Sequence, residues 1–311
     1  MLDAVSKAFF HALARSRSLK RLASRYGFRP SGGFGRRFIA GETVDEVLEA
    51  TRALQRSGMF ITLDHLGESV TSAAEADAAT RAYVSLIERI VASGVERNVS
   101  LKLSQLGLII DRATCLDNLR RVLDAARPHD FFVRLDMENS PYVEVTLDIF
   151  ETLWNHDYRN AGVALQSMLL RSEQDLARVN RLGARVRLIK GAYNEPRTVA
   201  YHRKADVDAA FVRMMQALLS EGVYAAVATH DVKMIEATRQ FAAERNISKD
   251  TFEFQMLYGI RRDLQASLVA DGYRMRVYVP FGREWFPYFM RRLGERPANV
   301  GFVLKGILRE W

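Results

Sequence analysis

The chain has 311 residues, of which 48% are hydrophobic, and it carries a formal net charge of +8 at neutral pH. This length suits one large α/β domain or two ordinary domains. The single cysteine, Cys115, excludes an internal disulfide bond and a cysteine-based zinc site and indicates a reducing compartment, and no run of about 18 apolar residues is available to span a membrane.

Residues 1–57 are predicted to be accessory helices and a linker. Segment 6–28 is basic and helix-compatible, with apolar residues at helical spacing. A transit peptide or a helix on a membrane surface would have these properties, but a helix packed on the domain body is the preferred interpretation. The glycine-rich segment 31–38 lacks the flanking strand, the flanking helix and the Lys-Ser/Thr ending of a phosphate-binding loop, so we interpret it as a linker.

From residue 58 to residue 311, short apolar runs alternate with helical patterns. The predicted strands are 59–64, 99–104, 131–136, 162–166, 186–190, 224–229, 252–255 and 276–280. The predicted helices are 72–93, 113–127, 141–154, 172–182, 204–221, 231–245, 260–270 and 284–295, and a closing helix is expected within 299–311. Eight such units favour an α/β fold of the (βα)8 TIM-type barrel class over a doubly wound sheet, which usually has fewer strands and a glycine fingerprint.

Polar side chains occupy the inward positions of these strands. Ile61 and Leu63 are expected to face the helices, whereas Asp64 faces inward, because side chains alternate along a strand. The other inward polar positions include Thr62, Ser100, Lys102, Ser104, Arg134, Asp136, Gln166, Arg187, Thr229, Gln255 and Tyr278, with Lys190 and His230 at adjoining turns. Barrel interiors are usually apolar, and burying an unpaired charge costs several kcal/mol, so a polar lumen indicates a ligand site.

Each of these residues also has an ordinary structural interpretation. Lys102 would suit an edge strand, Asp136 could cap the following helix, and His230 could cap or orient backbone. Asp64, His65, Asp136 and His230 could be assembled into a metal site, but the chain has no His-x-His pair or dense ligand cluster, so no metal is predicted.

The predicted helix 284–295 follows Pro280 and a turn at Gly282. Helical spacing separates an apolar face from a polar one. The apolar face carries Phe286, Phe289, Met290 and Leu293, and the polar face carries Tyr288, Arg291, Arg292 and Glu295. Two guanidiniums beside an aromatic ring make a receptor for a small carboxylate, although a solvated face with an Arg291–Glu295 pair is the alternative.

Several motifs together resemble the proline dehydrogenase family. They are SLKLSQLG, RLDMEN, VALQ, VRLIKGAY, ATHD, FEFQMLYGIR, RVYVPFG and PYFMRRLGERPANVGFV, which cover about residues 98–303. The RLIKGAY and YxxRRLxER elements are specific to that family, and the length is similar to its short monofunctional type. The resemblance implies a distorted (βα)8 barrel that holds FAD noncovalently, is preceded by accessory helices, oxidises L-proline to Δ1-pyrroline-5-carboxylate and passes electrons to a membrane quinone.

The resemblance also implies roles for individual residues. The residues implied to bind proline are Lys102, Leu257, Tyr278, Tyr288, Arg291 and Arg292, with Glu295 holding the helix in its closed position. Catalytic roles fall to Asp136, which orients Tyr278 and the arginines, and to Arg187 beside the reactive flavin nitrogen. The residues implied to contact FAD are Met137, Gln166, Arg187, Lys190, Gly191, Ala192, Thr229 and His230.

Two other functions remain open at this point. A Schiff-base lyase of the aldolase type would use Lys102 or Lys190 as its nucleophile. A nucleic-acid binder would explain the positive charge, but no recognised binding motif is present, so nucleic acid is not predicted as a partner. A cytoplasmic location is expected, and the charge is compatible with peripheral contact at the inner face of a membrane.

Overall fold

Parallel strands close into a barrel in the computed structural model, which describes residues 34–67 and 70–295. Neighbouring strands pair in chain order around the ring, and β1 pairs with β8 to close it. The strands are β1 (Phe60–His65), β2 (Asn98–Leu101), β3 (Phe132–Leu135), β4 (Ala161–Gln166), β5 (Arg185–Ile189), β6 (Ala225–Ala228), β7 (Phe252–Leu257) and β8 (Met275–Phe281). The predicted barrel and the order of its strands are therefore confirmed.

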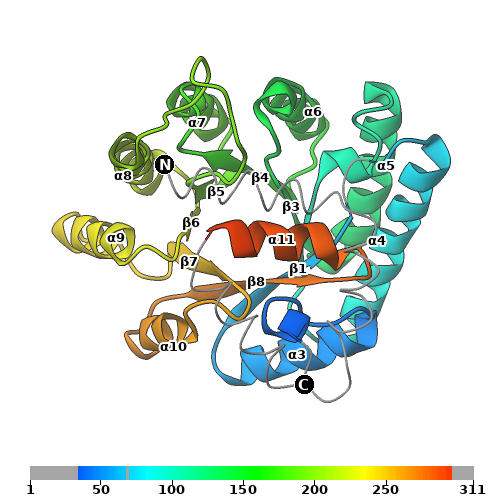
Figure 1. Ribbon diagram of the computed structural model, residues 1–311, viewed down its shortest axis with the longest axis horizontal. Coiled ribbons are helices and arrows are strands. Elements are labelled where there is room, and N and C mark those ends of the chain that lie inside the picture. Colours follow the sequence, from blue (N-terminus) through cyan, green and yellow to red (C-terminus); the bar gives the residue numbers. More distant parts are fainter. Residues whose placement is uncertain (1–33, 68–69, 296–311) are drawn as a thin grey trace.

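Helices surround the ring of strands (Figure 1). The α-helices are α3 (Val44–Arg56), α4 (Ala73–Ser93), α5 (Arg112–Ala126), α6 (Val143–Asn155), α7 (Ser172–Arg181), α8 (Lys204–Glu221), α9 (Val232–Glu244), α10 (Arg262–Ala270) and α11 (Trp285–Glu295). Short 3-10 helices are η1 (Phe34–Arg37), η2 (Leu103–Gln105), η3 (Arg127–His129) and η4 (Ser140–Tyr142). Each of the eight predicted helices from 72–93 to 284–295 is present, with ends shifted by two residues or fewer.

Side-chain caps explain where several helices begin. Ser72 accepts a hydrogen bond from the backbone N–H of Glu75 at the start of α4, and Asp111 accepts one from Thr114 at the start of α5. These bonds satisfy N–H groups that the first helical turn leaves without partners. Gly94 ends α4 in the left-handed conformation, with φ of 70°, which glycine adopts without steric cost.

The apolar core lies between the strands and the surrounding helices. Ile61 and Leu63 of β1, Val99 of β2 and Val133 of β3 belong to this core, and all four are completely buried. The predicted alternation is thus confirmed for β1. The inward positions are left for the polar residues that build the interior of the barrel.

The second strand is shorter than predicted. β2 ends at Leu101, and residues 103–105 form η2 instead of continuing the strand to residue 104. Ser104 therefore does not project from a strand into the lumen. Its backbone N–H and hydroxyl both donate to the buried carboxylate of Glu138, on the loop after β3.

The described part of the N-terminal region is packed against the barrel. η1 lies within the segment interpreted as a linker, and the described part of this segment is packed against the barrel, because Phe38 is buried and its ring lies 6.1 Å from that of Phe289 in α11. Backbone bonds of 2.9 Å join Ala40 to the Pro280 carbonyl and Gly282 to the Gly41 carbonyl. The helix predicted within 6–28 and the closing helix predicted within 299–311 lie outside the described residues.

Candidate active site

A cavity of about 400 Å³ opens at the carboxyl ends of the strands. Its lining includes Ile189, Ala228 and Leu257, the last residues of β5, β6 and β7. The other lining residues are Lys102, Asp136, Met137, Ala164, Arg187, Lys190, Gly191, Ala192, Tyr193, Thr229, His230, Asp231, Gln255, Met256, Tyr278, Tyr288, Arg291 and Arg292. This is the end of a (βα)8 barrel at which active sites are built, and the volume is in the range of small-molecule sites.

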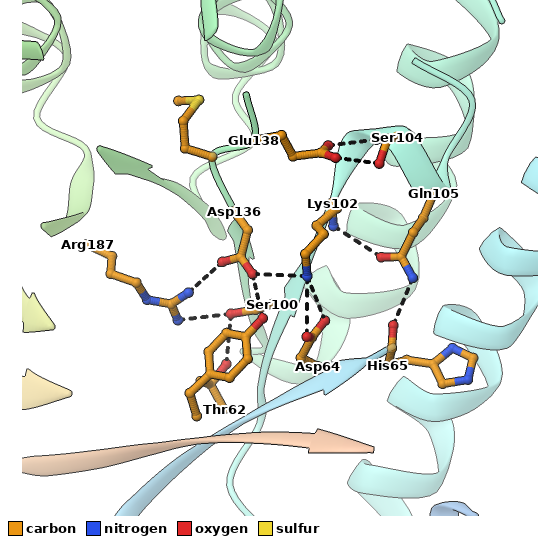
Figure 2. Close-up of polar contacts among 12 residues, drawn as sticks. Thr62, Asp64, His65, Ser100, Lys102, Ser104, Gln105, Asp136, Glu138 and Arg187 are labelled. Atoms are coloured by element: carbon orange, nitrogen blue, oxygen red, sulfur yellow. Dashed lines mark hydrogen bonds and ion pairs between the residues drawn. The ribbon is translucent and has the colours of Figure 1, made fainter. Parts of the chain in front are cut away.

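Asp136 is the centre of a polar network on the cavity wall. Its carboxylate accepts from Arg187 Nη1 at 2.5 Å and from the Tyr278 hydroxyl at 2.6 Å. Lys102 Nζ lies 3.7 Å from the same carboxylate and 3.3 Å from that of Asp64 (Figure 2). Asp136 comes directly after β3 but does not cap a helix. Its carboxylate therefore serves this network, and the alternative role as a helix cap is wrong.

Burial and charge keep the Tyr278 phenol protonated. Burial raises the pKa of Tyr278 well above its ordinary value, and the negative charges of Asp136 and Asp64 raise it further. The hydroxyl is therefore a hydrogen-bond donor to Asp136 at every physiological pH. The Arg187 guanidinium lies 5.2 Å from the centre of the Tyr278 ring, so the cation packs against an aromatic face.

A second charged cluster holds Lys190 at another part of the wall. The Lys190 ammonium donates to Asp208 at 2.5 Å and to Asp231 at 2.7 Å. Burial opposes ionisation of Asp231, but the bonds from Lys190 and Lys204 outweigh it and lower the pKa of Asp231. Both carboxylates are thus charged partners that fix the lysine.

Gln166 lies beside Gly191, which is one of the residues that line the cavity. The Gln166 amide nitrogen donates to the carbonyls of Met137 and Glu138 at 3.1 and 2.9 Å, while its buried Oε1 has no partner among the described residues. Gly191 has φ of 109°, and a Cβ at this position would lie 2.1 Å from Met168 Sδ. A side chain there would clash with Met168, and the positive φ is strained for other residues, so this position on the cavity wall requires glycine.

His230 orients backbone as well as lining the cavity. The backbone N–H of Leu257 donates to His230 Nε2 at 2.9 Å, so this ring nitrogen is the unprotonated one and the neutral ring carries its proton on Nδ1. The Thr229 hydroxyl accepts from the backbone N–H of Asp231 at 3.1 Å. The alternative structural role considered for His230 is therefore real and coexists with its place at the cavity.

Helix α11 lies across the ring of strands and brings its arginines to the cavity (Figure 1). Arg292 is 8% exposed, and its guanidinium lies 5.0 Å from the centre of the Tyr288 ring. At the start of the helix, the Trp285 indole donates to Glu42 at 3.0 Å. The polar face predicted for this helix therefore points inward at Tyr288, Arg291 and Arg292, and the interpretation as a solvated face is wrong.

The turn before α11 begins at Gly282, as predicted. β8 includes Pro280 and ends at Phe281, one residue beyond the predicted strand, so the connection consists of residues 282–284. Gly282 has φ of 120°, a conformation that favours glycine.

The cavity collects nearly all of the site residues predicted from the sequence. Gln166 is not among the lining residues but lies beside Gly191, which is, and the side chain of Glu295 is not among those that the structure describes. The sequence prediction missed Ala164, Ile189, Tyr193, Ala228, Asp231 and Met256 and gave no role to Gln255. The alternation of inward and outward side chains along a strand, here called strand parity, already placed Gln255 at the lumen. The ion pair of Asp231 with Lys190 depends on a loop conformation, which strand parity does not predict.

The described part of the chain has neither a metal-binding cluster nor a membrane-spanning helix. Among residues 34–67 and 70–295, no three His, Cys, Asp or Glu side chains are grouped so that they could hold a metal ion. Within the same ranges, no helix has the length and apolar character needed to cross a membrane.

The chain is similar to known proteins over most of its length. The family model described as proline dehydrogenase matches residues 47–305. Proline dehydrogenase 2 of Bacillus subtilis (strain 168) is 40% identical over 98% of this chain and all of its own length. Proline dehydrogenase of Deinococcus radiodurans is 44% identical over 88% of this chain and 89% of its own length.

A solved structure has the same fold. Proline utilization A (PutA) from Bdellovibrio bacteriovorus, inactivated by N-propargylglycine, superimposes with a TM-score of 0.79 at 28% identity. The match covers 84% of this chain and 32% of that one, so the likeness is to one part of a larger protein.

Proposed function

The chain belongs to the proline dehydrogenase family and is a proline dehydrogenase, and we propose that it oxidises L-proline to Δ1-pyrroline-5-carboxylate with noncovalently bound FAD and passes the electrons to a quinone. The observation that carries this proposal is the meeting of two features at one cavity. A pair of arginines on α11 offers a carboxylate receptor, and Arg187 supplies a fixed cation to the same cavity.

The wall around Gly191 fits a flavin. Beside it, the buried Oε1 of Gln166 has no partner among the described residues and is an acceptor suited to a ligand N–H, and Gly191 presents backbone without a side chain to the cavity. We assign Met137, Gln166, Lys190, Gly191, Ala192, Thr229 and His230 to FAD binding. When bound, FAD supplies a two-electron acceptor for the hydride of proline, and the cation of Arg187 favours its electron-rich reduced form.

The part of the cavity beside α11 fits proline. Arg291 and Arg292 present planar forks of donors that match a carboxylate, and Lys102 adds a third positive charge. Tyr278, Tyr288 and Leu257 supply the apolar surfaces that a pyrrolidine ring requires. Fixing the carboxylate sets where the ring carbons lie, and such positioning is a large part of catalysis.

The charged groups around the substrate also favour the reactive protonation state. The nitrogen of proline must be neutral for the ring carbon to lose hydride, because its lone pair stabilises the developing iminium. Lys102 and Arg187 are paired with Asp64 and Asp136, so these four groups together add little net charge. The two arginines of α11 also line the cavity, and their positive charge disfavours a positively charged substrate amine nearby.

A Schiff-base lyase is not favoured by the state of the two candidate lysines. Such an enzyme needs a neutral amine as its nucleophile. Lys102 forms ion pairs with Asp64 and Asp136, and Lys190 is held by Asp208 and Asp231. Both amines are thus already bound to two carboxylates each, and neither is available to attack a carbonyl carbon.

The quinone assignment concerns the fate of the electrons after proline is oxidised. A quinone dissolved in a membrane would require the protein to approach that membrane, and the net charge of +8 is compatible with attraction to anionic lipid. Faster reoxidation of the reduced enzyme by a soluble quinone than by oxygen would support this assignment.

The direct test is anaerobic titration of the FAD-loaded protein with L-proline. We expect the visible flavin absorption to bleach, and D-proline or a proline methyl ester, which lacks the carboxylate charge, to be far less effective. Protein that is colourless and cannot be loaded with FAD contradicts the proposal. Trapping of a carbonyl substrate by borohydride would instead support the lyase alternative.

A further inference from the structure

Arg187 is held on three sides. Nη1 donates to Asp136 at 2.5 Å, Nη2 donates to the Ser100 hydroxyl at 2.9 Å, and Nε donates to Gln255 Oε1 at 2.6 Å. The first two bonds lie at the outer end of the guanidinium. The bond to Gln255 fixes its Nε edge, so this amide, together with Asp136 and Ser100, sets the plane in which the cation faces the cavity.

The Gln255 amide is itself held in one orientation. Its nitrogen donates to Glu253 Oε1, two residues earlier on the same face of β7. A flipped amide would place its NH2 against the Arg187 N–H and its oxygen against the carboxylate. Both contacts would be repulsive, so the carboxylate of Glu253 determines that an oxygen is presented to Arg187.

Glu253 is a buried carboxylate that forms an ion pair with Arg276. It is 2% exposed, and Arg276 binds it through Nε at 2.7 Å and Nη2 at 2.9 Å. Burial acts to raise the pKa of Glu253, but the Arg276 charge and hydrogen bonds outweigh it and hold the pKa below its ordinary value. An ionised carboxylate only accepts hydrogen bonds, so it cannot satisfy a flipped amide.

We propose that Glu253 is a positioning residue for proline oxidation: it fixes the Gln255 amide, and through that amide it fixes the face of Arg187 at the cavity. Glu253 does not line the cavity and is not a catalytic residue. This inference rests on the proposed function, since it concerns the arginine assigned to the flavin.

Two variants break the proposed connection from Glu253 through Gln255 to Arg187, one at each of the first two residues. Glu253→Gln keeps the volume but removes the carboxylate, and Arg276 retains Glu96 and the Ile61 carbonyl as partners. Gln255→Met removes the amide and leaves the Glu253–Arg276 ion pair intact. Tyr224→Phe is the matched control, because the Tyr224 hydroxyl donates to Oε2 of Glu253 and not to the oxygen that holds Gln255.

The flavin midpoint potential is the main measurement, determined by reductive titration of the FAD-loaded proteins without proline. A misplaced Arg187 stabilises reduced flavin less, so both link variants should lower the potential. We expect about a tenfold shift in the two-electron equilibrium, which corresponds to about 30 mV. We also expect kcat to fall about tenfold while the KM for proline changes less than about twofold. Tyr224→Phe should match the wild type.

The sign of the shift separates positioning from a simple charge effect. Removing a buried negative charge without moving Arg187 would raise the potential, so a raised or unchanged potential in folded Glu253→Gln overturns the proposal. If that variant does not fold, Gln255→Met decides in the same way. The double variant should lower the midpoint potential and kcat no more than Gln255→Met alone does. Additive losses in the double variant would also contradict the proposal that Glu253 acts through Gln255.

The proposed function can fail independently. Wild-type protein that binds FAD but is not bleached by proline would refute the proposed reaction, while the potentials of the variants would remain measurable. A wild type that is bleached, with variants of unchanged potential, would refute only the role of Glu253.

Discussion

Replacing Arg292 by alanine should separate substrate binding from cofactor binding. Arg292 lines the cavity, is 8% exposed and stacks on Tyr288, so its guanidinium is largely screened from competing water. A charge-assisted hydrogen bond contributes about 1.5–3 kcal/mol, and a fork offers two of them to a carboxylate. Taking about 3 kcal/mol as the loss, the KM for proline should rise about 150-fold.

The assay is steady-state proline oxidation with an artificial electron acceptor, combined with the flavin content of the purified variant. Arg292→Lys should give an intermediate KM, since it keeps the charge and loses the fork. Arg283→Ala is the control, because Arg283 is an exposed arginine in the turn just before α11. An Arg292→Ala protein that loses its flavin, or keeps the wild-type KM, would show that α11 serves another ligand.

Three other outcomes are expected. Gly191→Ala should weaken FAD binding at least about tenfold, measured by flavin fluorescence, because its Cβ would meet Met168 Sδ and its φ is unfavourable for alanine. Burial raises the pKa of Cys115 to about 12, so the native thiol should resist a thiol reagent at pH 8 and react fully after unfolding in urea; rapid native labelling would contradict this burial. The rate of flavin reduction by proline should rise with pH to a plateau, with an apparent pKa below that of free proline, and a flat profile at saturating proline would refute the requirement for a neutral amine.

Strand parity predicted most of the site because the chemistry of a barrel lies on one face of each strand. Once a barrel was inferred from the sequence, Arg187, Tyr278 and Asp136 could be assigned to its interior, since their apolar neighbours at odd offsets had to face the helices. The structure joins the three by hydrogen bonds. The arginine face of α11 followed from helical spacing in the same way.

Predictions from strand parity were wrong where the backbone no longer follows a strand, as at the end of β2. The pattern of alternating residues continues past Leu101, but the chain turns into η2, and the hydroxyl of Ser104 binds Glu138 instead. Strand parity also could not predict the partners of Lys190 or the packing of Phe38 on α11. Those contacts join segments far apart in the chain, and local periodicity carries no information about which loops meet.

The pairing of β1 with β8 has a consequence for how the enzyme assembles. Phe60 pairs with Arg276 across more than 200 residues of chain, so ring closure is among the least local contacts in the molecule. Such contacts are slow to form, because the entropy of closing the loop must be overcome first. Tyr278 lies in β8 and α11 follows it, so an intermediate with an open ring lacks the part of the cavity that we propose binds proline. Bleaching of the flavin by proline during refolding would then report when barrel formation is complete.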